Sequence, residues 1–98
     1  MKTKTQAPDA NEFCLVLTPT VGAPLRASEA IRQRFDVLAD EIRRELAAIV
    51  GQLVEDSVER RPRKPITVTV MLGAGAIRGE VSDQGNLVPF EIPLTRPA

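Results

Sequence analysis

Gln52 and Asp56 are the first candidates for chemistry, because they sit four residues apart beside a regular apolar pattern. On a helix this spacing places both side chains on one face, next to the buried stripe. A carboxylate oxygen is a ligand that Mg²⁺ prefers, and Asp56 supplies one. Gln52 carries an uncharged amide, which cannot act as a general base. The same spacing also describes the solvated face of an ordinary amphipathic helix.

The second candidate motif is the turn Asp83-Gln84-Gly85, which follows a segment of alternating apolar residues. A carboxylate there can accept a hydrogen bond from a ligand, and a glycine lets the backbone approach a ligand closely. Read without a ligand, these residues form a plain connection between two strands. The chain contains no Gly-x-x-x-x-Gly-Lys-Ser/Thr loop and no His, which excludes a P-loop and a Cys/His zinc site.

Composition narrows the classes of partner. Thirteen basic and thirteen acidic side chains cancel, so no long-range field attracts nucleic acid or an anionic membrane. No run approaches the roughly 18 apolar residues of a membrane-spanning helix. The cations within residues 60–65 could contact phosphate, but we favour their role at a helix C-terminus. We therefore expect a cytoplasmic protein with neither nucleic acid nor a membrane as its partner.

Two helices are expected between the first strand and the hairpin, and the longer one carries the first motif. We expect residues 1–12 to be a disordered tail and residues 13–17 to form a strand. After a turn at residues 22–24, Ser28 is the expected N-cap of a first helix, and Asp40 that of a longer one. The longer helix has an apolar stripe formed by Ile42, Leu46, Ile49, Val50, Leu53, Val54 and Val58.

The second half of the chain indicates strands. Residues 66–72 and 77–82 alternate between apolar and polar side chains, which predicts an antiparallel hairpin. After residue 85, Pro89, Pro93 and Pro97 interrupt the apolar residues, so we expect an irregular, partly packed tail. The expected fold class is α+β, a two-layer sandwich with helices on one face of an antiparallel sheet, formed by a single domain over residues 13–98.

In this order of helix, hairpin and Asp-x-Gly turn, the chain resembles the nucleotide-binding half of the GHKL ATPases. Within that superfamily it is most similar to the small bacterial anti-sigma-factor serine kinases. The family motif Glu-Leu-Val-x-Asn-Ala corresponds here to residues 52–57, and Asp-x-Gly-x-Gly corresponds to residues 83–87.

This resemblance implies the residues of a nucleotide site. Asp83 would accept the adenine amino group of ATP or ADP, Gly85 would lie against the ligand, and Asp56 would ligate Mg²⁺. Gln52 stands in the place of the family's catalytic Glu, and Leu87 in the place of its second glycine. The family continues with a lid and further strands beyond the point that corresponds to Ala98, so the implied GHKL (Bergerat-type) fold is incomplete and C-terminally truncated.

Two classes of function follow. The resemblance implies an ATP-binding regulatory protein with weak or absent kinase activity, whose partner would be a sigma factor or a STAS-type anti-anti-sigma protein. The alternative is a non-catalytic interaction module derived from the same fold, which would bind such a partner or form a homodimer. A third interpretation, a fragment that folds poorly alone, would be excluded by cooperative unfolding.

Overall fold

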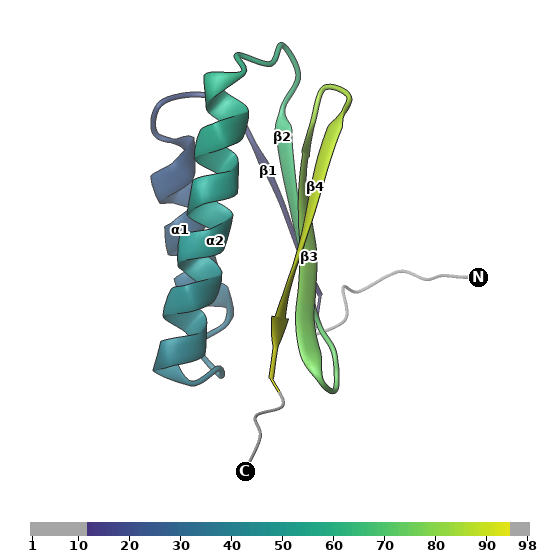
Figure 1. Cartoon of the computed structure of the whole chain (residues 1–98). Coiled ribbons are helices and arrows are strands. Elements are labelled where there is room, and N and C mark those ends of the chain that lie inside the picture. Colours follow the sequence, from purple (N-terminus) through teal and green to yellow (C-terminus); the bar gives the residue numbers. More distant parts are fainter. Residues whose placement is uncertain (1–11, 95–98) are drawn as a thin grey trace, which may run out of the picture.

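The computed structural model describes residues 12–94 and contains two helices on one face of a four-stranded antiparallel sheet (Figure 1). The elements are β1 (Glu12–Leu17), α1 (Ala23–Arg34), α2 (Asp40–Glu59), β2 (Ile66–Leu72), β3 (Ala76–Asp83) and β4 (Asn86–Pro93). The predicted α+β two-layer sandwich is confirmed. Of the tail predicted over residues 1–12, Glu12 begins β1, and the rest lies outside the described residues.

Helix α2 forms because its apolar residues recur every three or four positions and can be buried together. Leu46, Val50 and Val54 have no exposed surface, and Ile42 is 7% exposed. Asp40 is the first helical residue and not the predicted N-cap, since Ala39 holds that position without a side-chain hydrogen bond. No helix within residues 12–94 is long and apolar enough to cross a membrane.

Helix α1 begins six residues earlier than predicted, since Gly22 and not Ser28 is its N-cap residue. It starts at Ala23, and Pro24 lies in its first turn, where the fixed φ of proline suits a helix and the missing N–H is not needed. The predicted turn at residues 22–24 and the predicted cap at Ser28 are therefore wrong. The Ser28 hydroxyl instead donates to the carbonyl oxygen of Ala47 on α2, 3.2 Å away, and so ties the two helices together.

The sheet is a meander in the order β1-β2-β3-β4, with every neighbouring pair antiparallel. Leu15, Val68, Val81 and Val88 lie opposite one another across the four strands, so their side chains share one face. This face is the one that the helices cover (Figure 1), and the predicted apolar side of the hairpin lies there. No helix of the described residues lies over the other face.

Strand β4 replaces the irregular tail predicted after residue 85. The Gly73 amide donates to the Ala76 carbonyl at 2.9 Å, so Ala76 points its backbone groups at β2. Successive residues of β3 then point their N–H and C=O groups alternately at β2 and at β4. Gly79 consequently points its backbone groups at β4, whereas Pro89 and Pro93 direct their nitrogens to the free edge. Because a proline on the outer side of an edge strand loses no ladder bond, the prolines are compatible with this strand.

Gly79 lies at a crowded point of the sheet, between the buried residues Ile77 and Val81. A Cβ atom at this position would lie 2.5 Å from Cζ of the Phe90 ring and would also overlap the carbonyl oxygen of Thr69. Only a residue without a side chain fits between these two neighbours.

We expect Gly79→Ala to destabilise the fold by about 1–3 kcal/mol, because the added methyl group forces the sheet backbone to move. Urea unfolding followed by circular dichroism measures this change. Gly22→Ala is the matched control, since a Cβ there meets nothing within 4 Å. Its free energy of unfolding should change by less than about 0.5 kcal/mol. Equal effects of the two substitutions would contradict the crowding at Gly79.

Candidate functional site

The Asp-x-Gly motif forms the tight turn between β3 and β4. Asp83 ends β3 and pairs with Asn86, so Gln84 and Gly85 are the two turn residues. Gly85 has a φ of 84°, a left-handed conformation that glycine adopts without steric cost. The turn itself therefore explains the glycine of this motif, whether or not a ligand is bound.

Asp83 is the most enclosed charged group that the motifs provide. Two residues beyond the buried Val81, its side chain lies on the helix-facing side of the sheet and is 1% exposed. Its Oδ2 accepts hydrogen bonds from the Ser57 hydroxyl and from Arg60 Nη2, the latter at 2.7 Å. Its Oδ1 accepts one from Asn86 Nδ2 at 3.1 Å. Three side chains therefore occupy most of the acceptor capacity of this carboxylate.

The charge state of Asp83 follows from these contacts. Burial alone raises the pKa of a carboxyl, but the hydrogen bonds from Ser57, Arg60 and Asn86, with the charge of Arg60, outweigh it. The pKa of Asp83 therefore lies below its usual 3.8, and the group is ionised at neutral pH. Asp83 and Arg60 form an ion pair that closes the end of β3 against the end of α2.

Ser57 supplies the link between the two motifs. It is fully buried, on the apolar side of α2 as its spacing predicts. The sequence favours a bond from its hydroxyl back to the Leu53 carbonyl, as is common for serine in a helix. This prediction is wrong, because the hydroxyl donates to Asp83 on β3. Asp83 thus contacts the residue that follows Asp56.

Gln52 and Asp56 lie on one helix face, as their spacing predicts. Gln52 Nε2 donates to Asp56 Oδ1 at 3.0 Å, with Gln52 exposed and Asp56 partly buried. The amide therefore satisfies one oxygen of the carboxylate that the resemblance assigns to Mg²⁺. No group of three or more His, Cys, Asp or Glu residues within residues 12–94 could hold a metal ion.

The arrangement of Asp83 does not fit adenine recognition as it stands. An adenine amino group would need a free, accessible acceptor, and this carboxylate is already hydrogen-bonded on both oxygens and is 1% exposed. Binding would require Arg60 or Asn86 to withdraw. An Arg60 that is 40% exposed could move at little steric cost, but it would leave a buried carboxylate without its counter-charge.

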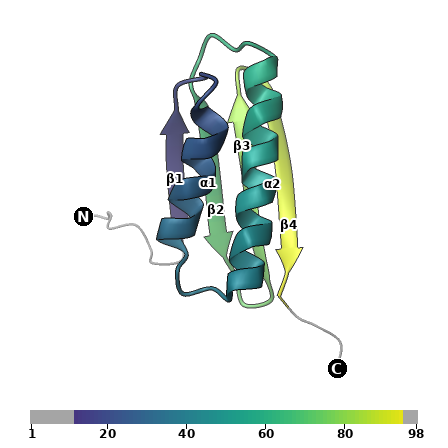
Figure 2. The same cartoon turned by 90° about the vertical axis from the view of Figure 1, so that its left-hand side faces the viewer.

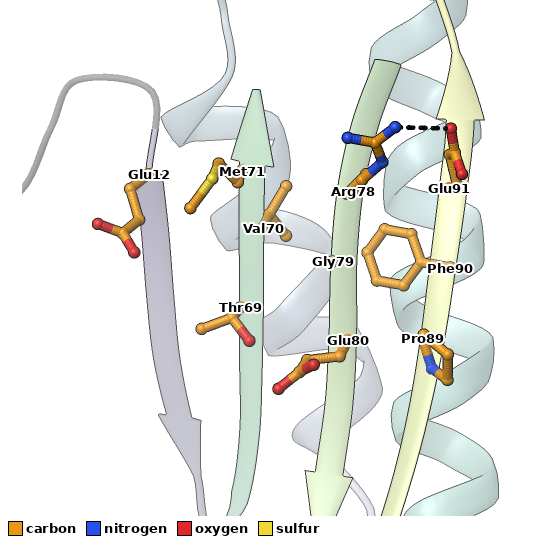
Figure 3. Close-up of a pocket in the computed structure, with 10 residues that line it drawn as sticks. All are labelled: Glu12, Thr69, Val70, Met71, Arg78, Gly79, Glu80, Pro89, Phe90 and Glu91. Carbon is orange, nitrogen blue, oxygen red and sulfur yellow. Dashed lines mark ion pairs between the residues drawn. The ribbon is translucent and has the colours of Figure 1, made fainter. Parts of the chain in front are cut away.

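A different candidate site lies on the helix-free face of the sheet. There an open concavity of about 710 Å³ combines the apolar groups of Met71 and Pro89 with charged side chains (Figure 3). Arg78 Nη2 and Glu91 Oε2 are 3.5 Å apart across β3 and β4. We call this surface the open-face concavity. Its full lining consists of Glu12, Thr69, Val70, Met71, Arg78, Gly79, Glu80, Pro89, Phe90 and Glu91.

Sequence reasoning missed the open-face concavity because part of it is built by β4, which was not predicted. The available signal was Met71, an apolar residue in phase with Thr67 and Thr69 on the polar side of β2. Met71 is 53% exposed, as an apolar residue on an uncovered face must be.

The chain is thus a small α+β two-layer protein with two candidate sites. One is the Asp83–Arg60 ion pair at one end of the sheet, and the other is the open-face concavity, which combines apolar and charged groups. Comparison with models of known protein families, with curated protein sequences and with solved structures gives no match.

The lowered pKa of Asp83 predicts how stability responds to acid. In the unfolded chain this carboxyl titrates near 3.8, so its contribution is fully present above that pH and is lost as the pH falls through the lower folded value. Asp83→Asn should remove this part of the acid response. At neutral pH it should destabilise the fold by about 1–3 kcal/mol, because it breaks a buried, charged hydrogen-bond cluster. Urea unfolding at a series of pH values measures both effects.

Asp40→Asn is the control for this experiment. The pKa of Asp40 is also lowered, by a hydrogen bond from Arg43 and by the charge of Arg44, but its side chain is 58% exposed. Solvent screens such pairs, so the loss of stability should be smaller than for Asp83→Asn. A larger loss from the exposed pair would show that the Asp83 cluster does not stabilise the fold.

Proposed function

We propose that this chain is a non-catalytic protein-interaction module with a fold of the anti-sigma-factor kinase type. The enclosure of Asp83 by Ser57, Arg60 and Asn86 carries this proposal, because it leaves the residue assigned to adenine without a free acceptor. Gln52 adds to it, since an amide stands where a phosphoryl-transfer site needs a carboxylate.

The open-face concavity is the surface we assign to the partner. It offers exposed apolar groups next to charges of both signs, the combination found where proteins bind one another. The resemblance to anti-sigma kinases suggests the class of partner, a sigma factor or a STAS-type anti-anti-sigma protein. In this role the chain would hold its partner by affinity alone.

ATP binding remains the second candidate, and one observation favours it. The two motifs lie in contact, since Ser57 bonds Asp83 and directly follows Asp56. A nucleotide that displaced Arg60 would meet both carboxylates at the end of α2. Mg²⁺ would then be held through Asp56 and would neutralise phosphate charge.

Calorimetric titration with ATP and ADP, with and without Mg²⁺, separates these two functions. We expect no heat of binding at millimolar nucleotide from a sample that unfolds cooperatively. Binding that requires Mg²⁺ and disappears in Asp56→Ala or Asp83→Ala would overturn the proposal and establish the nucleotide site. Ser82→Ala, on the helix-free face of β3, serves as the control variant that should leave any such binding unchanged.

The assigned surface is tested by Met71→Asp. If this surface is buried in the interface, the introduced carboxylate loses its hydration and gains no counter-charge. The affinity for the bound protein should therefore fall by at least about tenfold. Val37→Asp is the matched control, because Val37 is 82% exposed and lies in the loop that connects α1 to α2, outside the concavity. Each purified sigma factor and STAS-type protein of the same organism is titrated separately into the wild-type chain and into each variant. Equal losses for both variants, or no binding to any of these proteins, would contradict the assignment.

A further inference from the structure

The two outer strands of the sheet differ in what they present to solvent. On β4, Pro89 and Pro93 occupy outward positions, and neither has an N–H to donate. β1 contains no proline and a single charged residue, Glu12. Figure 2 shows β1 at the border of the sheet, on the side away from β4. Proline and charge are devices that keep edge strands from pairing, so one edge is protected and the other is open.

The ladder defines which backbone groups of β1 are open. Because Gly73 bonds Ala76 of β3, the odd-numbered residues of β2 point their backbone groups at β3 and the even-numbered ones at β1. The partners of these even-numbered residues are the odd-numbered residues of β1, whose backbone groups therefore point at β2. Glu12, Cys14 and Val16 therefore point their amide and carbonyl groups outward. Arg34 Nη2 donates to the Glu12 carbonyl oxygen at 3.1 Å, which agrees with this assignment. Within residues 12–94, no group hydrogen-bonds the backbone of Cys14 or Val16 on this side.

A second copy of β1 complements this edge. When the two strands run antiparallel with Cys14 opposite Cys14, Glu12 faces Val16 at both ends, and each outward amide meets an outward carbonyl. The Glu12 carbonyl has a second lone pair beside its bond from Arg34. The two Glu12 carboxylates are then about four residues, roughly 13 Å, apart along the strands. The chain's formal net charge of zero adds no long-range repulsion.

The side chains of β1 favour the same register. On the helix-facing side, Phe13 and Leu15 remain partly exposed, although their β2 neighbours Val70 and Val68 are 1% and 0% exposed. Pairing about Cys14 places Phe13 of each copy opposite Leu15 of the other. The border of the apolar layer is then covered by another apolar residue.

We propose that two copies of this chain associate through β1 in this Cys14-centred register, which joins two four-stranded sheets into one of eight strands. The association uses the outer backbone edge of β1, and Glu12 is the residue that this edge shares with the open-face concavity. The association needs neither a nucleotide nor another protein, so its failure is distinguishable from a failure of the proposed function.

Sedimentation velocity of the full chain over a concentration series tests the dimer, and Val16→Pro tests its surface. Proline at residue 16 removes an outward N–H without breaking a bond to β2. Two intermolecular hydrogen bonds are lost, one from each copy, so the dimer dissociation constant should rise by at least about tenfold. Leu87→Pro is the matched control, because it removes an outward N–H from the β4 edge, and it should leave dimerisation unchanged.

Cys14 reports the register, since it is the single cysteine of the chain and is exposed. A short bis-maleimide should link most of the wild-type chain into covalent dimers and should link little of Val16→Pro. Circular dichroism checks that each variant remains folded. A wild-type chain that is monomeric at all concentrations, or a dimer that persists in Val16→Pro, would overturn the proposal. A dimer that resists cross-linking at Cys14 would overturn the register.

Discussion

The packing of α2 against the sheet is the constraint on which the rest of the structure depends. A continuous stripe along this helix must be removed from water, and the valines of β2 and β3 provide the opposing surface. Ser57 lies on that same stripe, three residues after Val54. Its hydroxyl is therefore carried into the apolar layer and must find a hydrogen-bond partner there, which Asp83 supplies. The enclosed polar cluster is thus a direct consequence of how the helix is buried.

Helix α1 depends on α2 in turn. The two helices approach closely because small residues face each other, and a Cβ at Gly51 would lie 2.7 Å from the Ser28 hydroxyl. Both helices of residues 12–94 lie on one side of the sheet, so no helix of this part of the chain covers the second face. Because this face is uncovered, Met71 remains exposed, and the open-face concavity lies around it.

Local periodicity was sufficient to predict most of the fold. The stripe of α2 and the alternation of β2 are repeated over many residues, so a single atypical side chain does not hide them. The prediction failed at prolines that are compatible with two different local structures. Pro24 can end a turn or begin a helix, and Pro89 can break a strand or mark its outer edge, and only the tertiary position decides between them. The site was less predictable still, because Ser57 and Asp83 are brought together by packing and not by proximity in sequence.

The meander order of the sheet has a consequence for how the chain folds. β2, β3 and β4 are joined by tight hairpins, so each can pair with its neighbour after closing a very short loop. β1 is joined to β2 by a much longer connection, since Leu17 pairs with Ile66 and both helices lie between them in sequence. Loop-closure entropy therefore favours a folding order in which β1 joins the sheet last. In a single copy of the chain, β1 is therefore the strand whose amides open to solvent most readily, and pairing with a second copy would protect them.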